Sequence, residues 1–157
     1  MMQSPGRQLL KLWRQLSPYP GGKWLFARIF SLRVPYSGSV RPRFVVLEPG
    51  RAEVEIADRR GNRNHLGSVH AIALINAAEQ ASGLAMLTQL PDGFRSIVIR
   101  ISMDYLKKAR GPIRAVSTVV LPVITADTDI DVMADCLNRE GTPVARATVR
   151  WRVGPMR

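Results

Sequence analysis

The sequence predicts an α+β domain in which a curved antiparallel sheet wraps around one long central helix. An Ala-rich run at residues 72–86 is long enough for a helix and too apolar to lie at a surface. Segments of alternating apolar and polar residues, typical of strands, precede and follow this run. Short turns join the strand segments and favour antiparallel pairing. Because one face of such a sheet would be bare and apolar, we expect the helix to cover it.

Two helices rich in basic residues are expected ahead of the sheet. Residues 5–17 place large apolar side chains on one helical face, and the segment 18–22, with two prolines and two glycines, ends this helix. A second helix is predicted over residues 23–34. We therefore divide the chain into a basic N-terminal helical extension, residues 1–36, and a main domain, residues 37–157. Such helices commonly pack as a cap on a domain, and contact with a membrane surface is the alternative.

The strands follow from period-two alternation. The strand pattern begins near residue 40, and a second strand is predicted over residues 52–58, ahead of the central helix. Four strands are predicted after it, over residues 96–107, 114–123, 129–137 and 144–153. In the first of these four, alternation would place a set of large side chains on one face: Ile97, Ile99, Ile101, Met103 and Tyr105.

Length and composition indicate one soluble globular domain. The chain has 157 residues, of which 46% are hydrophobic, and no apolar run approaches the roughly 18–20 residues of a membrane span. We expect no secretory signal at the N-terminus. The single cysteine, Cys136, excludes an internal disulfide, so a reducing, cytoplasmic location is the simplest interpretation.

The net charge of +11 is unevenly distributed along the chain. Residues 1–47 contain eight Lys or Arg and no acid, the first carboxylate being Glu48. Such a surface attracts polyanions, whether nucleic acid, acidic lipid or a phosphorylated cofactor. A charged, solvated surface without a specific partner is equally consistent with the pattern. No nucleic-acid-binding motif is present, so we predict no specific nucleic-acid partner.

The most informative segment is the polar loop that leads into the central helix. Asn64, two histidines and Gly67 precede the helix, and the acidic Glu79 lies near its middle. A polar loop, the N-terminus of a helix and a buried acid are the ingredients of a binding or catalytic site. We therefore predict a functional site in this part of the chain.

The element order, together with the pattern Asn64-x6-Ala71-x7-Glu79, resembles the hotdog fold, and more narrowly the small acyl-CoA thioesterases of the phenylacetate-pathway type and their uncharacterised relatives. The resemblance covers about residues 40–153. In that family a loop Asn precedes a His-Gly-Gly helix start, matched here by His70-Ala71-Ile72. Residues 105–109, Tyr-Leu-Lys-Lys-Ala, also resemble the family's strand that ends in a Tyr before a polar turn.

The resemblance implies hydrolysis of an acyl-CoA thioester at a site formed between two protomers. The N–H of Ala71 would bind the developing oxyanion, which backbone donors at a helix N-terminus stabilise well. Glu79 of the other protomer would be the base or nucleophile, with its pKa raised by an apolar setting. Asn64 would position the water or the carboxylate, and His70 is a further catalytic candidate. The implied assembly is a homodimer or a dimer of dimers.

Substrate contacts are expected on both sides of the helix start. Gly67 and Ser68 lie in the loop, and Lys107, Lys108 and Arg110 form a basic turn that suits coenzyme A phosphates, although a solvated turn fits equally well. Coenzyme A would enter as part of the substrate, and no cofactor is implied. With two histidines and a lone cysteine that alternation places in the core, no metal site is predicted.

Other functions stay open because the sequence departs from the family pattern. Ala71-Ile72 replaces Gly-Gly, and a hydroxyl expected on the following strand falls near Val98, with Ser96 offset from it. A non-catalytic module that binds acyl-CoA or an acyl-carrier protein is therefore the alternative. Structural roles are open as well: Glu79 would pair with an arginine of the sheet or of a partner chain, and Asn64 would only close a turn.

Overall fold

The computed structural model describes residues 4–156. Its elements are α1 (Pro5–Leu16), α2 (Gly22–Arg33), α3 (Pro35–Gly38), β1 (Arg43–Glu48), β2 (Arg51–Ile56), a short 3-10 turn η1 (Arg60–Asn62), α4 (Ala71–Leu87), β3 (Phe94–Tyr105), β4 (Ile113–Thr118), β5 (Thr128–Leu137) and β6 (Pro143–Pro155). Two strands precede the long helix and four follow it, as the sequence predicts.

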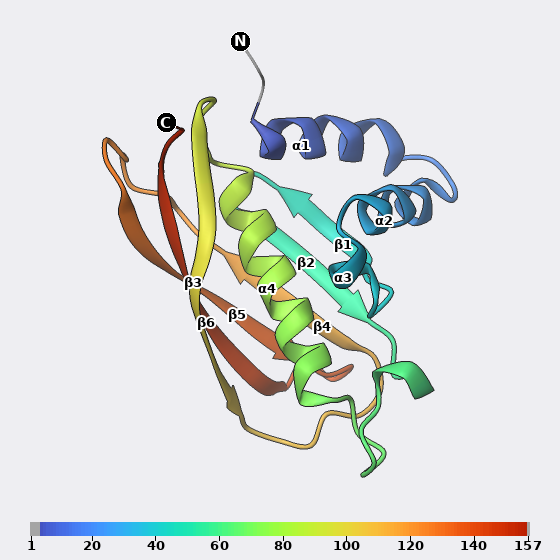
Figure 1. Ribbon diagram of the computed structural model, residues 1–157. Helices are drawn as coiled ribbons and strands as arrows, with labels where there is room; N and C mark the ends of the chain where they lie inside the picture. Colours follow the sequence, from blue (N-terminus) through green and yellow to red (C-terminus); the bar gives the residue numbers. More distant parts are fainter. Residues whose placement is uncertain (1–3, 157) are drawn as a thin grey trace.

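The strands form one antiparallel sheet in the order β1-β2-β4-β5-β6-β3, which curves around α4 (Figure 1). The α+β prediction is confirmed, and the fold is that of the hotdog proteins. β1 and β3 are the two edges of the sheet. The backbone groups on the outer side of β3 have no partner strand among the described residues, a feature that bears on the site below.

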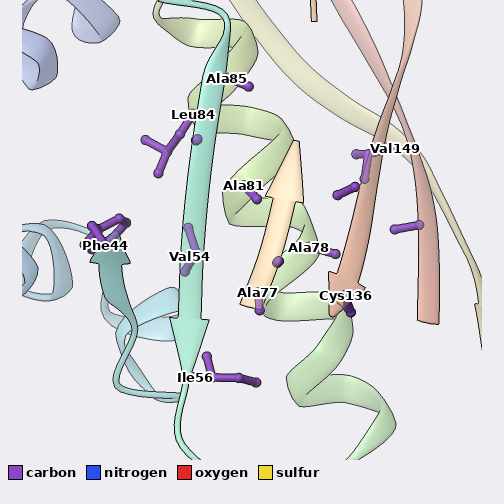
Figure 2. Packing of buried hydrophobic residues seen from close by; sticks show 14 of the residues in the cluster. Phe44, Val54, Ile56, Ala77, Ala78, Ala81, Leu84, Ala85, Cys136 and Val149 are labelled. Atoms are coloured by element: carbon purple, nitrogen blue, oxygen red, sulfur yellow. The ribbon is translucent and has the colours of Figure 1, made fainter. Parts of the chain in front are cut away.

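Small side chains let α4 lie close to the sheet. Ala77, Ala78 and Ala81 are fully buried on α4 and face strands that carry buried residues such as Val54 and Val149 (Figure 2). Interiors pack at near-crystalline density, so alanines on the helix leave room for branched residues on the sheet. This packing explains why the run at residues 72–86 is so apolar.

The expected face of β3 is wrong in one respect. Val98 lies opposite Trp151 and Arg100 lies opposite Arg150, so Ile99 is an extra residue that forms a bulge. A bulge reverses the alternation beyond it. Ile97 therefore shares the outer face with the exposed Arg152 that it pairs with, whereas Ile101 shares the inner face with Val149.

Aromatic contacts fasten α1 and α2 onto β1. Ring centroids lie 5.2 Å apart for Trp13 and Phe26, 5.1 Å for Phe26 and Phe44, and 4.9 Å for Phe30 and Phe44, all edge-to-face. Edge-to-face pairs add to the stabilisation that burial gives. The helices expected at the N-terminus are present and share the hydrophobic core. The division of the chain into domains at residue 36 stays a prediction.

Buried amides hold α3 against α4. Asn76 Nδ2 donates to the carbonyl of Tyr36 at 3.2 Å, and Gln80 Nε2 donates to the carbonyl of Ser37 at 3.1 Å. Gln80 Nε2 also donates to Asn76 Oδ1 at 2.5 Å. These amides therefore serve the packing of α3. None of the helices within residues 4–156 is long and apolar enough to cross a membrane.

The outer face of β5 and β6 carries a ladder of ion pairs. Arg152 contacts Asp129, Arg150 contacts Asp131 and Arg146 contacts Asp135, each through two nitrogen–oxygen contacts. Each pair joins residues directly opposite one another on the two strands. Opposite charges at such positions stabilise the pairing of strands.

Candidate functional site

His70 caps the N-terminus of α4. Its Nδ1 accepts from the N–H of Ile72 at 3.1 Å, which satisfies one of the free donors of the first turn. Within residues 4–156 the N–H of Ala71 has no acceptor, so it is a donor that a ligand could use. This arrangement gives His70 a local structural contact and leaves Ala71 open.

Asn64 closes the loop before the helix. Its Oδ1 accepts from the N–H of Leu66 at 2.9 Å and from that of Ser68 at 3.1 Å. Gly67 occupies a left-handed conformation with φ of 67°, which glycine adopts without strain. The turn-closing alternative therefore describes Asn64 Oδ1, and only its Nδ2 remains for a ligand. Ser68 Oγ is buried and has no partner among the described residues.

The basic turn after β3 lies beside this loop, although about forty residues separate the two in sequence. The N–H of Val69 donates to the carbonyl of Ala109 at 2.9 Å, and the hydroxyl of Tyr105 donates to the carbonyl of Ala71 at 3.3 Å. Lys107, Lys108 and Arg110 follow Tyr105 and are all exposed. Three exposed cations thus lie on the turn that contacts the loop before α4.

Glu79 is a half-buried carboxylate without a partner. Among residues 4–156, no hydrogen bond or ion pair reaches its side-chain oxygens. Burial raises the pKa of Glu79 above its ordinary value. An arginine partner within the chain would oppose that shift, and none is present in the described part of the chain. Pairing with an arginine of the sheet is therefore wrong as an account of Glu79 in the single chain.

Trp151 and Glu79 both lie close to Gly83, and Trp151 was not predicted as part of the site. A Cβ added to Gly83 would come within 2.9 Å of Trp151 Cη2, and Glu79 Oε1 lies 4.0 Å from the same point. Gly83 therefore leaves space for the indole ring, which is buried and whose Nε1 has no partner among the described residues. The mid-helix glycine was the sequence signal, since glycine there costs about 1 kcal/mol.

A single chain does not bring the acid and the helix start together. Glu79 lies eight residues after Ala71 on the same straight helix, about 12 Å along its axis. Ala71, Tyr105, the loop and the basic turn form one cluster, and Glu79 with Trp151 and Gly83 forms another.

Other reactive groups in the chain do not contribute to these clusters. Cys136 is buried under α4, and burial raises the pKa of its thiol to about 12, which makes it a poor nucleophile. In the described residues no three His, Cys, Asp or Glu side chains are grouped to hold a metal ion.

Comparison with known proteins places this architecture in a family. Residues 22–153 match the model of a domain of unknown function, DUF4442. The chain belongs to the DUF4442 family. The matched range includes α2 and α3 as well as the whole sheet and α4. Among proteins with curated descriptions, no significant match is found.

Solved structures show the same fold for this DUF4442 chain. A protein from a genomics programme is 33% identical, with a TM-score of 0.82 over 96% of this chain and 99% of that one. A Pseudomonas aeruginosa protein described as a probable thioesterase is 21% identical, with a TM-score of 0.72 over 80% of this chain and 91% of that one. A thioesterase family protein from Silicibacter pomeroyi is 20% identical, with a TM-score of 0.70 over 83% and 96%. Because of their low sequence identity, the last two similarities show a shared fold only.

Proposed function

We propose that this protein hydrolyses an acyl-CoA thioester as a hotdog dimer in which Glu79 is the base or the nucleophile. The observation that carries the proposal is Glu79 itself, a half-buried carboxylate with a raised pKa and no partner in the described chain. Unpaired buried acids are costly and cluster at functional sites. The thioesterase descriptions of structural neighbours support the same class of reaction.

The proposed chemistry joins the two clusters across a dimer. As a base, Glu79 takes a proton from water, and the water oxygen attacks the thioester carbonyl carbon. The oxyanion that forms accepts from the N–H of Ala71 of the other protomer, which has no acceptor among the described residues of its own chain. When the intermediate collapses, the carbon–sulfur bond breaks and the thiolate takes the proton from Glu79. The products are a carboxylic acid, which releases its proton to water, and free coenzyme A.

An edge of the sheet is available for the second protomer. The outer side of β3 is unpaired in the described chain, and exposed apolar side chains lie on β3 and at the start of α4, among them Ile72, Ile101 and Tyr105. A long strand edge with apolar neighbours is unstable in water and favours pairing with a second strand. We propose that two copies of β3 pair here. A dimer of dimers would need a further interface.

The coenzyme A portion is proposed to bind at the entrance of α4. Lys107, Lys108 and Arg110 would contact its phosphates, and the loop at Gly67 and Ser68 would border its pantetheine chain. Arginine and lysine both suit phosphate groups. The contact between Val69 and Ala109 supports this grouping, because it holds the basic turn against the loop.

The test is the substitution Glu79→Gln, with Glu140→Gln in an exposed turn as the matched control. Release of free thiol from a panel of acyl-CoAs would be measured for both variants and the wild type. Glu79→Gln should lower the rate at least about 100-fold, as loss of a general base does, and Glu140→Gln should not. Circular dichroism checks the fold, and an unchanged rate for Glu79→Gln would refute the role.

A binding module is the second candidate, because Ala71-Ile72 stands where the family pattern that the sequence resembles has two glycines. The Cβ of Ala71 crowds the approach of a thioester and restricts the backbone. Tight binding of acyl-CoA or an acyl-carrier protein by the wild type, without release of thiol, would select this function. In that case Glu79→Gln would change affinity alone.

A further inference from the structure

Helix α2 has an apolar side that faces away from the protein. Phe26 and Phe30 point inward and pack on β1. Trp24 and Leu32 lie two turns apart on the opposite side and are 68% and 76% exposed. Helices of globular proteins normally turn one apolar stripe to the core and a polar side to water. The exposed apolar stripe on α2 therefore indicates a surface that binds a partner.

Side chains at both ends of α2 extend this surface. Tyr19 precedes the helix and is 70% exposed, and Tyr36 follows it and is 73% exposed. We name the surface the α2 outer face, and it consists of Tyr19, Trp24, Leu25, Arg28, Leu32 and Tyr36. The guanidinium of Arg28 lies 6.0 Å from the centre of the Trp24 ring, so a cation is placed among the apolar groups.

The surroundings of the α2 outer face are uniformly positive in sequence. Residues 1–47 include eight Lys or Arg and no acid. Arg7 pairs with Asp92 and Arg43 with Glu55. Among the described residues no ion pair reaches Lys11, Arg14, Arg28 or Arg33. Helices α1 and α2 therefore keep free positive charge, and Arg28 lies beside the exposed ring of Trp24.

We propose that the α2 outer face binds the surface of a lipid bilayer that contains acidic lipids. Exposed Trp, Tyr and Leu side chains on a helix enter the boundary between headgroups and acyl chains, while Lys and Arg contact lipid phosphates. A second copy of this chain would bring two cationic segments together, which disfavours self-association through this face. The aliphatic Leu25 and Leu32 favour lipid over nucleic acid as the partner.

The position of α2 leaves the proposed thioester site free. α2 packs on β1, whereas β3 forms the other edge of the sheet (Figure 1). α1 crosses the end of α4, and its start contacts Asp92 just before β3. A protein bound to a bilayer through α2 could therefore form a dimer through β3 at the same time. The inference goes beyond the proposed hydrolysis and does not depend on it.

Flotation of the full chain with vesicles tests the proposal. The vesicles contain phosphatidylcholine alone, or phosphatidylcholine with about 30% phosphatidylglycerol as the acidic lipid. The wild type should float with the anionic vesicles only and should dissociate at high salt. Trp13 and Trp151 are buried, so Trp24 reports contact with lipid. Its emission should shift to the blue on binding, and brominated lipids should quench it.

Two pairs of variants separate apolar from electrostatic contact. Trp24→Ser with Leu32→Ser should weaken binding by on the order of tenfold or more. Val120→Ser with Val123→Ser, which are even more exposed and lie in the loop between β4 and β5, should not. Arg28→Gln with Arg33→Gln should weaken binding by about tenfold, whereas Arg60→Gln with Arg139→Gln should leave it within about twofold. Circular dichroism checks that each variant folds.

Several results would overturn the proposal. They are failure of the wild type to bind anionic vesicles, equal binding to neutral vesicles, and a Trp24 emission that does not move. A fall in oligomer size for Trp24→Ser with Leu32→Ser, measured by light scattering, would assign the face to a second copy. Binding of single-stranded DNA through the same side chains, without vesicle binding, would assign it to nucleic acid.

Discussion

Carboxylates on the two sides of the sheet differ in whether they have partners within the chain. On the outer face of β5 and β6, Asp129, Asp131 and Asp135 each meet an arginine directly across the strand pair. On the α4 side, Glu79 has no partner within the described residues. The acids of the outer face thus have their partners within one chain, whereas Glu79 on α4 does not. This difference supports the proposal that a second protomer binds at β3.

The same contrast appears in acid strength. Hydrogen bonds from Arg152 and Arg150 hold the pKa values of Asp129 and Asp131 below the ordinary range. Burial raises the pKa of Glu79. Paired acids of this kind support folding when ionised, and the ionisation of Glu79 opposes it. A buried acid whose ionisation opposes folding is a candidate for a functional role, which is the basis for the proposal that Glu79 acts in catalysis.

The largest expected effect comes from breaking the β3 edge. Ile101→Glu would place an unpaired charge at the proposed interface, and unpaired charges strongly disfavour association. We expect a monomer and a loss of thioester hydrolysis of about 100-fold, because the two halves of the site would no longer meet. Light scattering and thiol release measure the two effects. Val123→Glu, in an exposed loop, is the control, and a dimeric, active Ile101→Glu would contradict the proposed interface.

The next effect concerns the space between Gly83 and Trp151. Gly83→Ala would place a Cβ 2.9 Å from the indole ring, and overpacking of this kind costs about 1–3 kcal/mol. Alanine gains about 1 kcal/mol in helix propensity, so the net loss should be no more than about 2 kcal/mol. Chemical denaturation measures it. In a Trp151→Leu background the same substitution should stabilise the protein, and a loss of equal size there would show that the ring is not the cause.

Glu79 should make stability fall as pH rises. Its folded pKa is raised, so the folded state holds a proton that the unfolded state releases near the ordinary glutamate pKa of about 4.3. Stability is therefore greatest below about pH 4 with respect to this group, and it declines until the raised pKa is passed. The free energy of unfolding of Glu79→Gln relative to the wild type should increase over this window. A difference that does not vary with pH would contradict the assignment.

The smallest effect is expected on the outer face. Asp131→Asn removes a paired but exposed acid, and such pairs contribute little and are screened by salt. Because the folded pKa of Asp131 is lowered, its contribution is present above about pH 4 and is lost as pH falls further. Thermal unfolding of Asp131→Asn and the wild type should therefore converge in acid. If the unfolding temperatures of the variant and the wild type converged at high pH instead, the proposed contribution of the Asp131 pair would be wrong.

The sequence by itself determined the order of elements and the fold. Alternation located the strands, and an apolar run that no surface would tolerate located α4, because burial and backbone hydrogen bonding leave recurrent patterns along a chain. The pattern also singled out Asn64, Ala71 and Glu79, whose roles stay proposals. It could not reveal the bulge at Ile99, which depends on how β3 registers against β6.

Only the tertiary structure decided which side chains have partners. In the structure Asn64 Oδ1 accepts hydrogen bonds within the loop, and Asn76 and Gln80 donate hydrogen bonds to α3. Glu79 has no partner in the described chain. The structure also showed that α2 buries one apolar side and exposes another. Contacts of this kind join residues far apart in sequence, and local patterns do not encode the distances between them.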